Sequence, residues 1–558
     1  MITTKIFSRV ADIACSDKTK RIYRAIPSLL SWLYAIFSLA CVLYYTIWPA
    51  EGYFHSDCTD SIYWAQASVD GGAVFNPDFV YAAMLPFSAS IWLVPLIKIF
   101  GVTMTTHVIG MVIFALLFFL SIIFVCRSLE WSWNMTFITT GSVMLLLSSS
   151  DKMREIMWGH VIYYSLGLLI LFVGMGLLLR MCKSFELGKT RKGYTYAALL
   201  FVFMMLGATN GLQCIAIYTL PLIAAIAAEI FFNSKEKIIS KHNMFHGFGM
   251  LLLCAATFSG LVLLNLLKGD IVAGYADAYS LFDDVTTWVD NLLIFPESYL
   301  LLFGIEITDG ASLGSMETIS ALVKTVVAAV LLVLPIVLLI CYRKIENRST
   351  KILLWAHIAV SAVIMMGFIC GRLSAGNWRL IPMVGTSILV SFAAVREMFA
   401  MEDCALVWKR VGVILLIVPI MGSLVNFKEI SAMPKDYGRD NELHVVADFL
   451  EAQGLEYGYA TFWNSQSLTL ISNSDVRVRG VNVTSKDGVT PYYYQTNITW
   501  YEDQDGVEKY FVALTNYEAS VLNYNSKWNF IKETHLLETL DCEGFKIFVF
   551  DTNIFTVE

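Results

Sequence analysis

The sequence of 558 residues predicts an all-α polytopic membrane bundle of about 11 transmembrane helices, followed by a small extracytoplasmic α/β domain. Three observations support this fold class. Hydrophobic residues make up 57% of the chain and charged residues 15%, whereas soluble domains carry about 25% charged residues. Long apolar runs recur up to about residue 430, and the remaining segment is acidic and rich in turn signals. The sequence contains no basic patch of the kind that would indicate a nucleic-acid partner.

Eleven runs approach the ~20 apolar residues that cross ~30 Å of hydrocarbon. The first is too long and too far along the chain for a cleaved signal peptide. The expected spans are 28–48, 104–126, 134–150, 160–180, 194–209, 211–232, 245–267, 318–341, 351–370, 379–395 and 411–428.

The distribution of Lys and Arg predicts the orientation of this bundle. One set of loops contains most of them, such as those after the spans ending at 180 and 341, and the opposite short loops contain few. Because basic residues favour cytoplasmic loops, the N-terminus is expected in the cytoplasm and the C-terminal domain outside the plasma membrane.

The chain is therefore divided into a transmembrane catalytic domain, 1–430, and an extracytoplasmic α/β domain, 431–558. From Lys435 onward it contains 19 acidic and 9 basic side chains. A helix is expected over 441–453, and β-rich stretches over 467–471, 476–483, 511–514 and 545–550. A disulfide between Cys58 and Cys542 is an open alternative to two free thiols.

The loop 49–103, expected on the outer face, contains two early acids. A helix over 56–69 would place Asp57, Asp60 and Trp64 on one face. The apolar stretch 81–100 contains two prolines and is interpreted as an interfacial or re-entrant helix. A full span there would reverse every later loop and remove the basic bias.

Three groups of residues resemble the GT-C superfamily of polytopic glycosyltransferases, which includes protein O-mannosyltransferases and the lipid A aminoarabinose transferase. These are the first-loop acids with the run Leu85-Pro86-Phe87 to Ile99-Phe100-Gly101, then Arg372 before Trp378-Arg379-Leu380-Ile381-Pro382, and Gly458-Tyr459-Ala460-Thr461-Phe462-Trp463 in the tail. The resemblance implies a polyprenyl-phosphate-sugar donor and a first-loop acid that acts as base or metal ligand. The chain lacks an Asp-Glu pair in that loop and the Trp-Trp-Asp signature of oligosaccharyltransferases, so the subfamily and the acceptor (glycan, lipid or protein) stay open.

Displacement of a polyprenyl phosphate from a sugar needs a base for the acceptor proton and cations for the leaving phosphate. Asp57 is the first candidate base. Asp60 is the second, or its partner on a divalent ion such as Mg²⁺ or Mn²⁺. The alternative is structural: Asp57 at an N-cap, with Asp60 three residues later, would cap the helix.

A second charged cluster is expected on an outer loop. Asp151 and Glu155 share a helical face and could complete a metal site with Asp57; Glu155 could instead pair with Arg154. Lys152 and Arg154 are candidates for lipid-phosphate binding. The alternative is a set of solvated charges at a helix junction.

Two further arginines, Arg372 and Arg379, flank a Gly-rich outer boundary and are also candidate phosphate ligands, with snorkelling as the alternative. Trp288 lies in the loop 268–317, a possible acceptor-facing lid. Candidate substrate contacts are His55, Trp64, His160 and Trp288. Tyr492-Tyr493-Tyr494 and Trp500 could stack on sugar or pack the small domain onto lipid.

The resulting hypothesis is a cell-envelope glycosyltransferase of hexosyltransferase type. It would move a sugar from a polyprenyl-phosphate donor to an extracytoplasmic acceptor with inversion. The alternatives are a transporter or flippase for a lipid-linked glycan, and a noncatalytic membrane scaffold.

Overall fold

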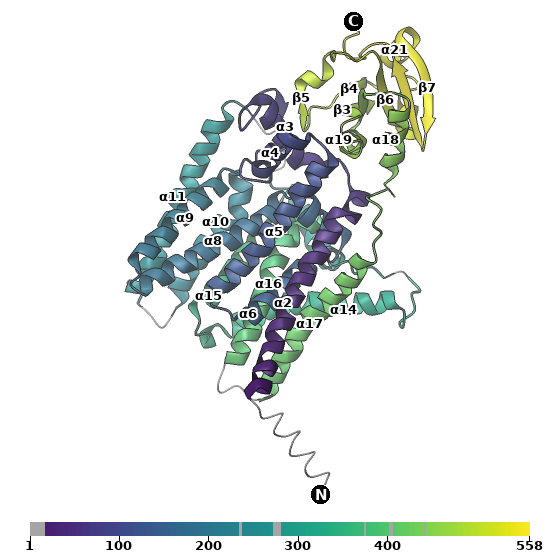
Figure 1. The fold of residues 1–558 in the computed structure, drawn as a ribbon. Coiled ribbons are helices and arrows are strands. Elements are labelled where there is room, and N and C mark those ends of the chain that lie inside the picture. Colours follow the sequence, from purple (N-terminus) through teal and green to yellow (C-terminus); the bar gives the residue numbers. More distant parts are fainter. Residues whose placement is uncertain are drawn as a thin grey trace.

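The structure is a computed structural model that describes residues 17–233, 237–271, 281–307, 309–372, 375–400, 406–439 and 441–557. A bundle of long helices forms its lower part, and a small sheet domain built from the C-terminal residues sits above one end of the bundle (Figure 1). Short elements of the first inter-helix loop lie between the two parts. The molecule is therefore a multi-pass helical bundle with a small α/β region, as predicted.

Every expected span is a helix in the described residues, and the eleven helices follow the expected order. They are α2 (Asp17–Ile47), α5 (Met104–Ser128), α6 (Trp133–Leu146), α8 (Tyr163–Glu186), α9 (Thr190–Ala208), α10 (Gly211–Phe232), α11 (Lys241–Lys268), α14 (Met316–Ile340), α15 (Arg348–Cys370), α16 (Ile381–Ala400) and α17 (Leu406–Ser431).

Nine of these helices in the described chain are long and apolar enough to cross a membrane. The other two are α6, which has 14 residues, and α9, which opens with a basic turn. At 1.5 Å per residue, α6 rises about 21 Å, less than the ~30 Å of hydrocarbon. Its residues from Thr139 to Leu146 are buried, so α6 packs inside the bundle.

Polar caps set where several helices begin. The side chains of Thr103, Ser132, Ser315 and Asn347 accept backbone N–H groups at the starts of α5, α6, α14 and α15, which satisfies amides that have no intrahelical partner. Within the bundle α16 is central, since 94% of its apolar stretch is buried, compared with 17% for α11.

The loop between α2 and α5, called the first outer loop for the side on which the sequence predicts it, forms η1 (Pro49–Tyr53), η2 (Ser56–Thr59), α3 (Asp60–Gly71), β1 (Phe79–Val80) and α4 (Ser90–Phe100). The helix expected over 56–69 thus begins as a 3₁₀ turn, and Gly72 in the left-handed region (φ 59°) ends it. Of the apolar stretch 81–100, only the last 11 residues are helical. They rise about 16 Å, so α4 does not cross the membrane.

The C-terminal region contains a six-stranded sheet in the order β4-β3-β2-β6-β8-β7. The strands are β2 (Tyr457–Thr461), β3 (Arg477–Thr484), β4 (Gly488–Pro491), β6 (Tyr510–Thr515), β7 (Leu536–Cys542) and β8 (Phe545–Phe550). Strand β2 runs parallel to β3 and β6, and the other pairs are antiparallel. The helices are α18 (Glu442–Ala452), α19 (Phe462–Ile471), α20 (Asn516–Val521) and α21 (Ser526–His535).

One sequence expectation for this region is wrong, and one open alternative is decided. The stretch 467–471, expected as a strand, forms the end of helix α19. This helix packs against β3 on one side and against η2 on another, and these contacts override the local strand pattern. Cys58 and Cys542 are both free and buried, so the disulfide alternative is excluded. The division at 430/431 stays a prediction, although the last membrane helix ends at Ser431.

Segments far apart in the sequence join the two parts. Strand β1 pairs with β5 (Thr496–Asn497), and the Trp64 indole donates to Gln495 Oε1 at 2.7 Å. Thr59 donates to Gln466 at 2.9 Å. The first outer loop is therefore held directly against the C-terminal sheet region.

Candidate functional site

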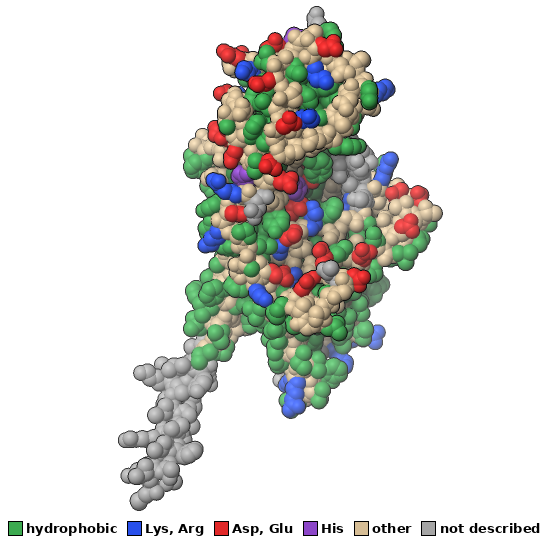
Figure 2. Space-filling view, turned by 90° about the vertical axis from the view of Figure 1, so that its right-hand side faces the viewer, with side chains coloured by type: hydrophobic (Ala, Val, Ile, Leu, Met, Phe, Trp, Pro, Cys, Tyr) green, Lys and Arg blue, Asp and Glu red, His purple; other side chains and the backbone are tan. Residues whose placement is uncertain are grey.

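Charged and histidine side chains gather in a recessed strip between the C-terminal region and the apolar helices below it (Figure 2). Three short elements converge near this level: η2, α7 (Asp151–Arg154) and the π-helix η3 (Glu155–His160). We call His55, Asp57, Lys152 and Glu155 the junction cluster. These four residues come from the first and second outer loops.

Asp57 is half-buried on η2. Within the described residues its carboxylate forms no hydrogen bond or ion pair. The capping alternative is wrong, because the N-cap of η2 is His55 and that of α3 is Thr59, and neither end has a side-chain cap bond. An acid that does not stabilise its own helix remains available to accept a proton.

Asp60 has a different environment. It is 6% exposed, and its Oδ2 lies 3.2 Å from His160 Nε2. Burial raises the pKa of Asp60, although the hydrogen bond and charge of His160 oppose the rise. Asp60 therefore connects α3 to η3 and positions the neighbouring turn that carries Asp57.

Glu155 links His55 and Lys152. Its Oε1 lies 3.3 Å from His55 Nε2, and Lys152 Nζ donates to both carboxylate oxygens at 2.8 Å. Burial would raise the pKa of Glu155, but the bonds from His55 and Lys152 lower it to about 2. Burial would also lower the pKa of His55, but Cys58 and the Glu155 carboxylate raise it to about 11. The Glu155 carboxylate therefore lies between the Lys152 side chain and an imidazole whose protonated form it favours.

The backbone that carries Glu155 and His160 is irregular. Residues Glu155–His160 form a π-helical turn, and Val161 after it has φ 49°. π-Turns occur frequently at functional sites, and a β-branched residue in the left-handed region is strained. The strain is consistent with a segment whose side chains are held in place for a purpose other than packing.

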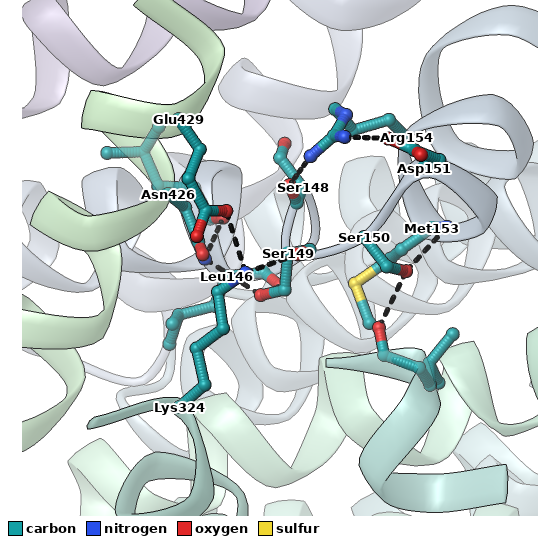
Figure 3. A network of polar contacts seen from close by, with 12 residues as sticks. Leu146, Ser148, Ser149, Ser150, Asp151, Met153, Arg154, Lys324, Asn426 and Glu429 are labelled. Carbon is teal, nitrogen blue, oxygen red and sulfur yellow. Dashed lines mark hydrogen bonds and ion pairs between the residues drawn. The ribbon is translucent and has the colours of Figure 1, made fainter. Parts of the chain in front are cut away.

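Arg154 and Asp151 take part in a second polar network (Figure 3). Arg154 pairs with Asp151 and donates to the Ser148 carbonyl at 2.9 Å. Nearby, Lys324 Nζ donates to the Ser149 carbonyl at 3.0 Å and to Glu429 at 2.7 Å. The bonds of Lys324 join α14 to α17 and to the chain just before α7, whereas the bonds of Arg154 stay within residues 148–154.

The alternative pairing of Glu155 with Arg154 is not seen, since Arg154 bonds to Asp151 and Glu155 to Lys152. Adjacent residues on a helix do not face each other, whereas residues three apart do. The side chains of Asp151 and Glu155 are therefore each occupied by a cation.

The proposed metal ligands Asp57, Asp151 and Glu155 do not fit a divalent ion in this arrangement. No group of three or more His, Cys, Asp or Glu in the described residues is positioned to hold a metal. Asp151 and Glu155 each direct oxygen atoms at a cationic side chain.

The segment that contains Arg372 and Arg379 contacts the junction cluster at Lys152. The Lys152 Nζ lies 5.1 Å from the centroid of the Trp378 ring. Trp378 and the buried Arg379 are in η5 (Asn377–Leu380). Arg372 is exposed after α15, and its backbone N–H donates to Leu281 at 2.9 Å. Thus η5 is brought to the junction cluster, whereas no contact joins the described Arg372 side chain to it.

Trp64 and Trp288, the two tryptophans predicted to contact substrate, lie outside the junction cluster. Trp64 is 4% exposed and bonds to Gln495 at the contact between the two parts. Trp288 is on α13 (Val285–Leu302), where its indole donates to the Asp283 carbonyl at 2.9 Å. Asp284 caps the same helix.

Sequence reasoning did not select Trp463, Gln466 or Gln495. Trp463 is 60% exposed, and its ring centroid lies 6.2 Å from that of His55. The signal for it was present in the Gly458-to-Trp463 stretch. Gln466 and Gln495 had no signal, because isolated glutamines are common on surfaces.

No family model matches the chain, and no curated protein matches it. Its fold is similar to two crystal structures of ArnT, the lipid A aminoarabinose transferase, from Cupriavidus metallidurans. The apo structure is 11% identical with a TM-score of 0.54, covering 94% of this chain and 98% of that chain. The structure bound to undecaprenyl phosphate is 11% identical with a TM-score of 0.52, covering 93% and 97%.

This likeness is one of fold. It confirms the GT-C-like architecture expected from the sequence, over nearly the whole length of both chains.

Proposed function

We propose that the protein is a GT-C-type membrane glycosyltransferase that moves a sugar from a polyprenyl-phosphate donor to an extracytoplasmic acceptor, with inversion. The observation that carries this proposal is the half-buried Asp57 carboxylate, which has no bond to any described residue and lies on η2 two residues after His55, the partner of Glu155. The ArnT structure with bound undecaprenyl phosphate supports a polyprenyl-phosphate partner.

In the proposed reaction the acceptor hydroxyl oxygen attacks the anomeric carbon from the side opposite the phosphate. The new C–O bond forms as the bond from the anomeric carbon to the phosphate oxygen breaks. The acceptor proton moves to Asp57, and the electron pair of the broken bond leaves with the polyprenyl phosphate. A positioned base of this kind typically contributes 10²–10⁴-fold to the rate.

Cations are needed where negative charge develops on the leaving phosphate. Lys152 is the candidate within the junction cluster, where it contacts both Glu155 and the Trp378 ring. Arg379 and the exposed Arg372 are candidates at the late boundary. Arg154 is a weaker candidate because Asp151 and the Ser148 carbonyl already engage it.

For the acceptor side, Trp463 offers an exposed aromatic face above His55. Its neighbour Phe462 contacts Tyr492 and Tyr494, and those two rings are stacked 5.6 Å apart. Aromatic faces of this kind suit sugar rings. We place the junction cluster and the C-terminal region outside the plasma membrane, as the Lys and Arg distribution favours.

The test is transfer from radiolabelled undecaprenyl-phosphate sugars to candidate acceptors by protein reconstituted in lipid. Asp57→Asn keeps the shape of the side chain and removes the base, so we expect the transfer rate to fall by about 10²–10⁴-fold. The exposed Asp505, on a loop of the C-terminal region, supplies the matched control Asp505→Asn, which should retain wild-type transfer.

Equal transfer by Asp57→Asn and wild type would refute the role of Asp57. Movement of intact lipid-linked glycan across the bilayer, without a covalent product, would favour the transporter or flippase alternative.

A further inference from the structure

A cavity of about 450 Å³ lies on the opposite side of α3 from the residues that contact η3. It is bounded by α3, the end of α4, β3 and Trp500. Its volume falls in the ~300–1,000 Å³ range of small-molecule sites. The junction cluster contributes no lining residue.

Two arginines of β3 line this cavity. Arg477 and Arg479 are two residues apart on the strand and so point to the same face of the sheet. Arg479 is 8% exposed, and its guanidinium carbon lies 3.9 Å from the centroid of the Trp500 ring. Neither arginine forms an ion pair within the described residues.

Two buried polar atoms of the cavity lining have no partner in the described part of the chain. These are Arg479 Nε and the hydroxyl of Tyr63, which is 1% exposed; neither atom makes a hydrogen bond of normal geometry, although Arg479 and Thr469 lie near enough to the Tyr63 hydroxyl to oppose the rise in its pKa that burial causes. A buried donor without a partner costs about 1–3 kcal/mol, and a buried cation costs more unless an anion compensates it. Both atoms line the same cavity as Arg477.

Little negative charge opposes these donors. The acid in the lining is Asp70, which is exposed and accepts a hydrogen bond from Gln66. Burial raises the pKa of Asp70, with Gln66 and the charge of Arg479 opposing that rise. Two guanidinium groups therefore face one surface carboxylate.

We propose that this cavity binds a phosphate group, held by Arg477 and Arg479 with the Tyr63 hydroxyl as a neutral donor. Planar guanidinium groups bind phosphate oxygens in pairs, and the Trp500 ring holds Arg479 in place. The phosphate belongs either to a lipid headgroup or to a free phosphorylated molecule. Ile99 and Phe100 of α4 are exposed beside the cavity end of that helix and offer an apolar contact to a lipid. The inference does not rest on the transferase reaction.

The test is calorimetric titration of the full-length protein in a neutral detergent with inorganic phosphate. Arg477→Gln removes one guanidinium from a half-buried position and should weaken phosphate binding at least tenfold, since a charge-assisted bond contributes about 1.5–3 kcal/mol. Asp70→Asn removes the opposing charge and should strengthen binding by about threefold. Arg439→Gln, at an exposed site outside the cavity, should leave binding unchanged.

Tyr63→Phe separates ligand binding from packing. A ligand donor predicts weaker phosphate binding, whereas a hydroxyl that is merely buried predicts unchanged binding and equal or greater thermal stability. Phosphate that binds at Lys152 instead would respond to none of these substitutions.

The source is distinguished in nanodiscs. If phosphatidylglycerol in the disc competes with inorganic phosphate, and Arg477→Gln abolishes the competition, the ligand is a lipid headgroup. If phosphate binding is equal in discs with and without phosphatidylglycerol, the ligand is a free phosphate. The proposal is overturned if Arg477→Gln and wild type bind phosphate and phosphatidylglycerol equally, or if wild type binds neither.

Discussion

Glu155 accepts bonds from His55 and Lys152 together, and this sets the charge of the junction cluster. The pKa of Glu155 lies below its ordinary 4.5, at about 2, so the stability that it contributes is present above pH 4.5 and is lost as the pH falls through about 2. The pKa of His55 lies above its ordinary 6.5, at about 11, so its contribution is complete below pH 6.5 and is lost as the pH rises through about 11. Both contributions are complete between pH 4.5 and 6.5.

Glu155→Gln removes the anion between the two cations. Because the Glu155 contribution is lost while burial and Cys58 still act on His55, the pKa of His55 should fall below its wild-type value of about 11, and unfolding should become easier by about 1–3 kcal/mol. The side-chain chemical shift of labelled His55, followed against pH, measures the change.

Glu508→Gln, at an exposed loop position, serves as the control and should leave the His55 titration as in wild type. Unchanged titration of His55 in Glu155→Gln would mean that the contact does not govern its charge.

The sequence indicated the members of this cluster but not their pairing. Spacing selected His55, Asp57, Lys152 and Glu155 because each follows or precedes a span. It could not assign Glu155 to His55, since the two come from different loops and a π-turn sets the direction of Glu155. Trp64, chosen for its place on the face of Asp57, instead bonds to a glutamine 431 residues away.

At the level of elements, the linker after α17 fits closely against η1. Gly438 has φ 69°, and a Cβ atom there would lie 2.3 Å from the backbone carbon of Glu51. The Asn441 side chain then donates to the Phe54 carbonyl at 2.9 Å. The linker thereby determines how the C-terminal region meets the first outer loop.

Gly438→Ala should therefore destabilise the protein by more than backbone conformation alone explains. A residue other than glycine at positive φ costs about 1–3 kcal/mol, and the clash with Glu51 adds to that cost. Thermal unfolding in detergent measures the sum.

Gly454 also has positive φ (66°) but nothing within 4 Å of its Cβ position. Gly454→Ala consequently reports the backbone cost by itself. If the two variants unfold at the same temperature, the close fit of the linker is not a source of stability.

Hydropathy located the eleven helices because each is set by its own apolar run. Prediction of secondary structure from the local sequence pattern was wrong where tertiary packing favours a different conformation. Residues 467–471 alternate like a strand, yet they complete a helix whose polar side is buried against η2 and β3. The apolar stretch 81–100 was limited to an 11-residue helix, and the sequence alone indicated only that it should not span.

For the whole molecule, the network of Lys324, Glu429, Asn426 and Ser149 (Figure 3) meets the chain at Ser149, three residues before Lys152, and so lies near the end of the bundle that carries the junction cluster. Charged groups at a membrane boundary cost less than at its centre. The same end carries the C-terminal region, and the distribution of Lys and Arg predicts that the opposite end is cytoplasmic.

This orientation predicts that a cysteine at residue 505 faces outward. In a Cys254→Ser background, Asp505→Cys should react with a membrane-impermeant maleimide in spheroplasts, because the loop is exposed. Leu187→Cys, in the loop between α8 and α9, should react only after the membrane is opened. The reverse labelling pattern would invert the proposed topology.

The pairing of β1 with β5 has a consequence for biogenesis. Trp64 and Gln495 are 431 residues apart, so at ~5–20 residues per second a ribosome needs about 20–90 s to make the partner after the tryptophan. Throughout that interval the acidic loop stays on the membrane surface with its strand edge and indole uncovered. The first outer loop can therefore complete its contacts only after Gln495 has been synthesised. A nascent chain that stalls before Gln495 would contain every predicted span but would lack the β1–β5 pair and the bond from Trp64.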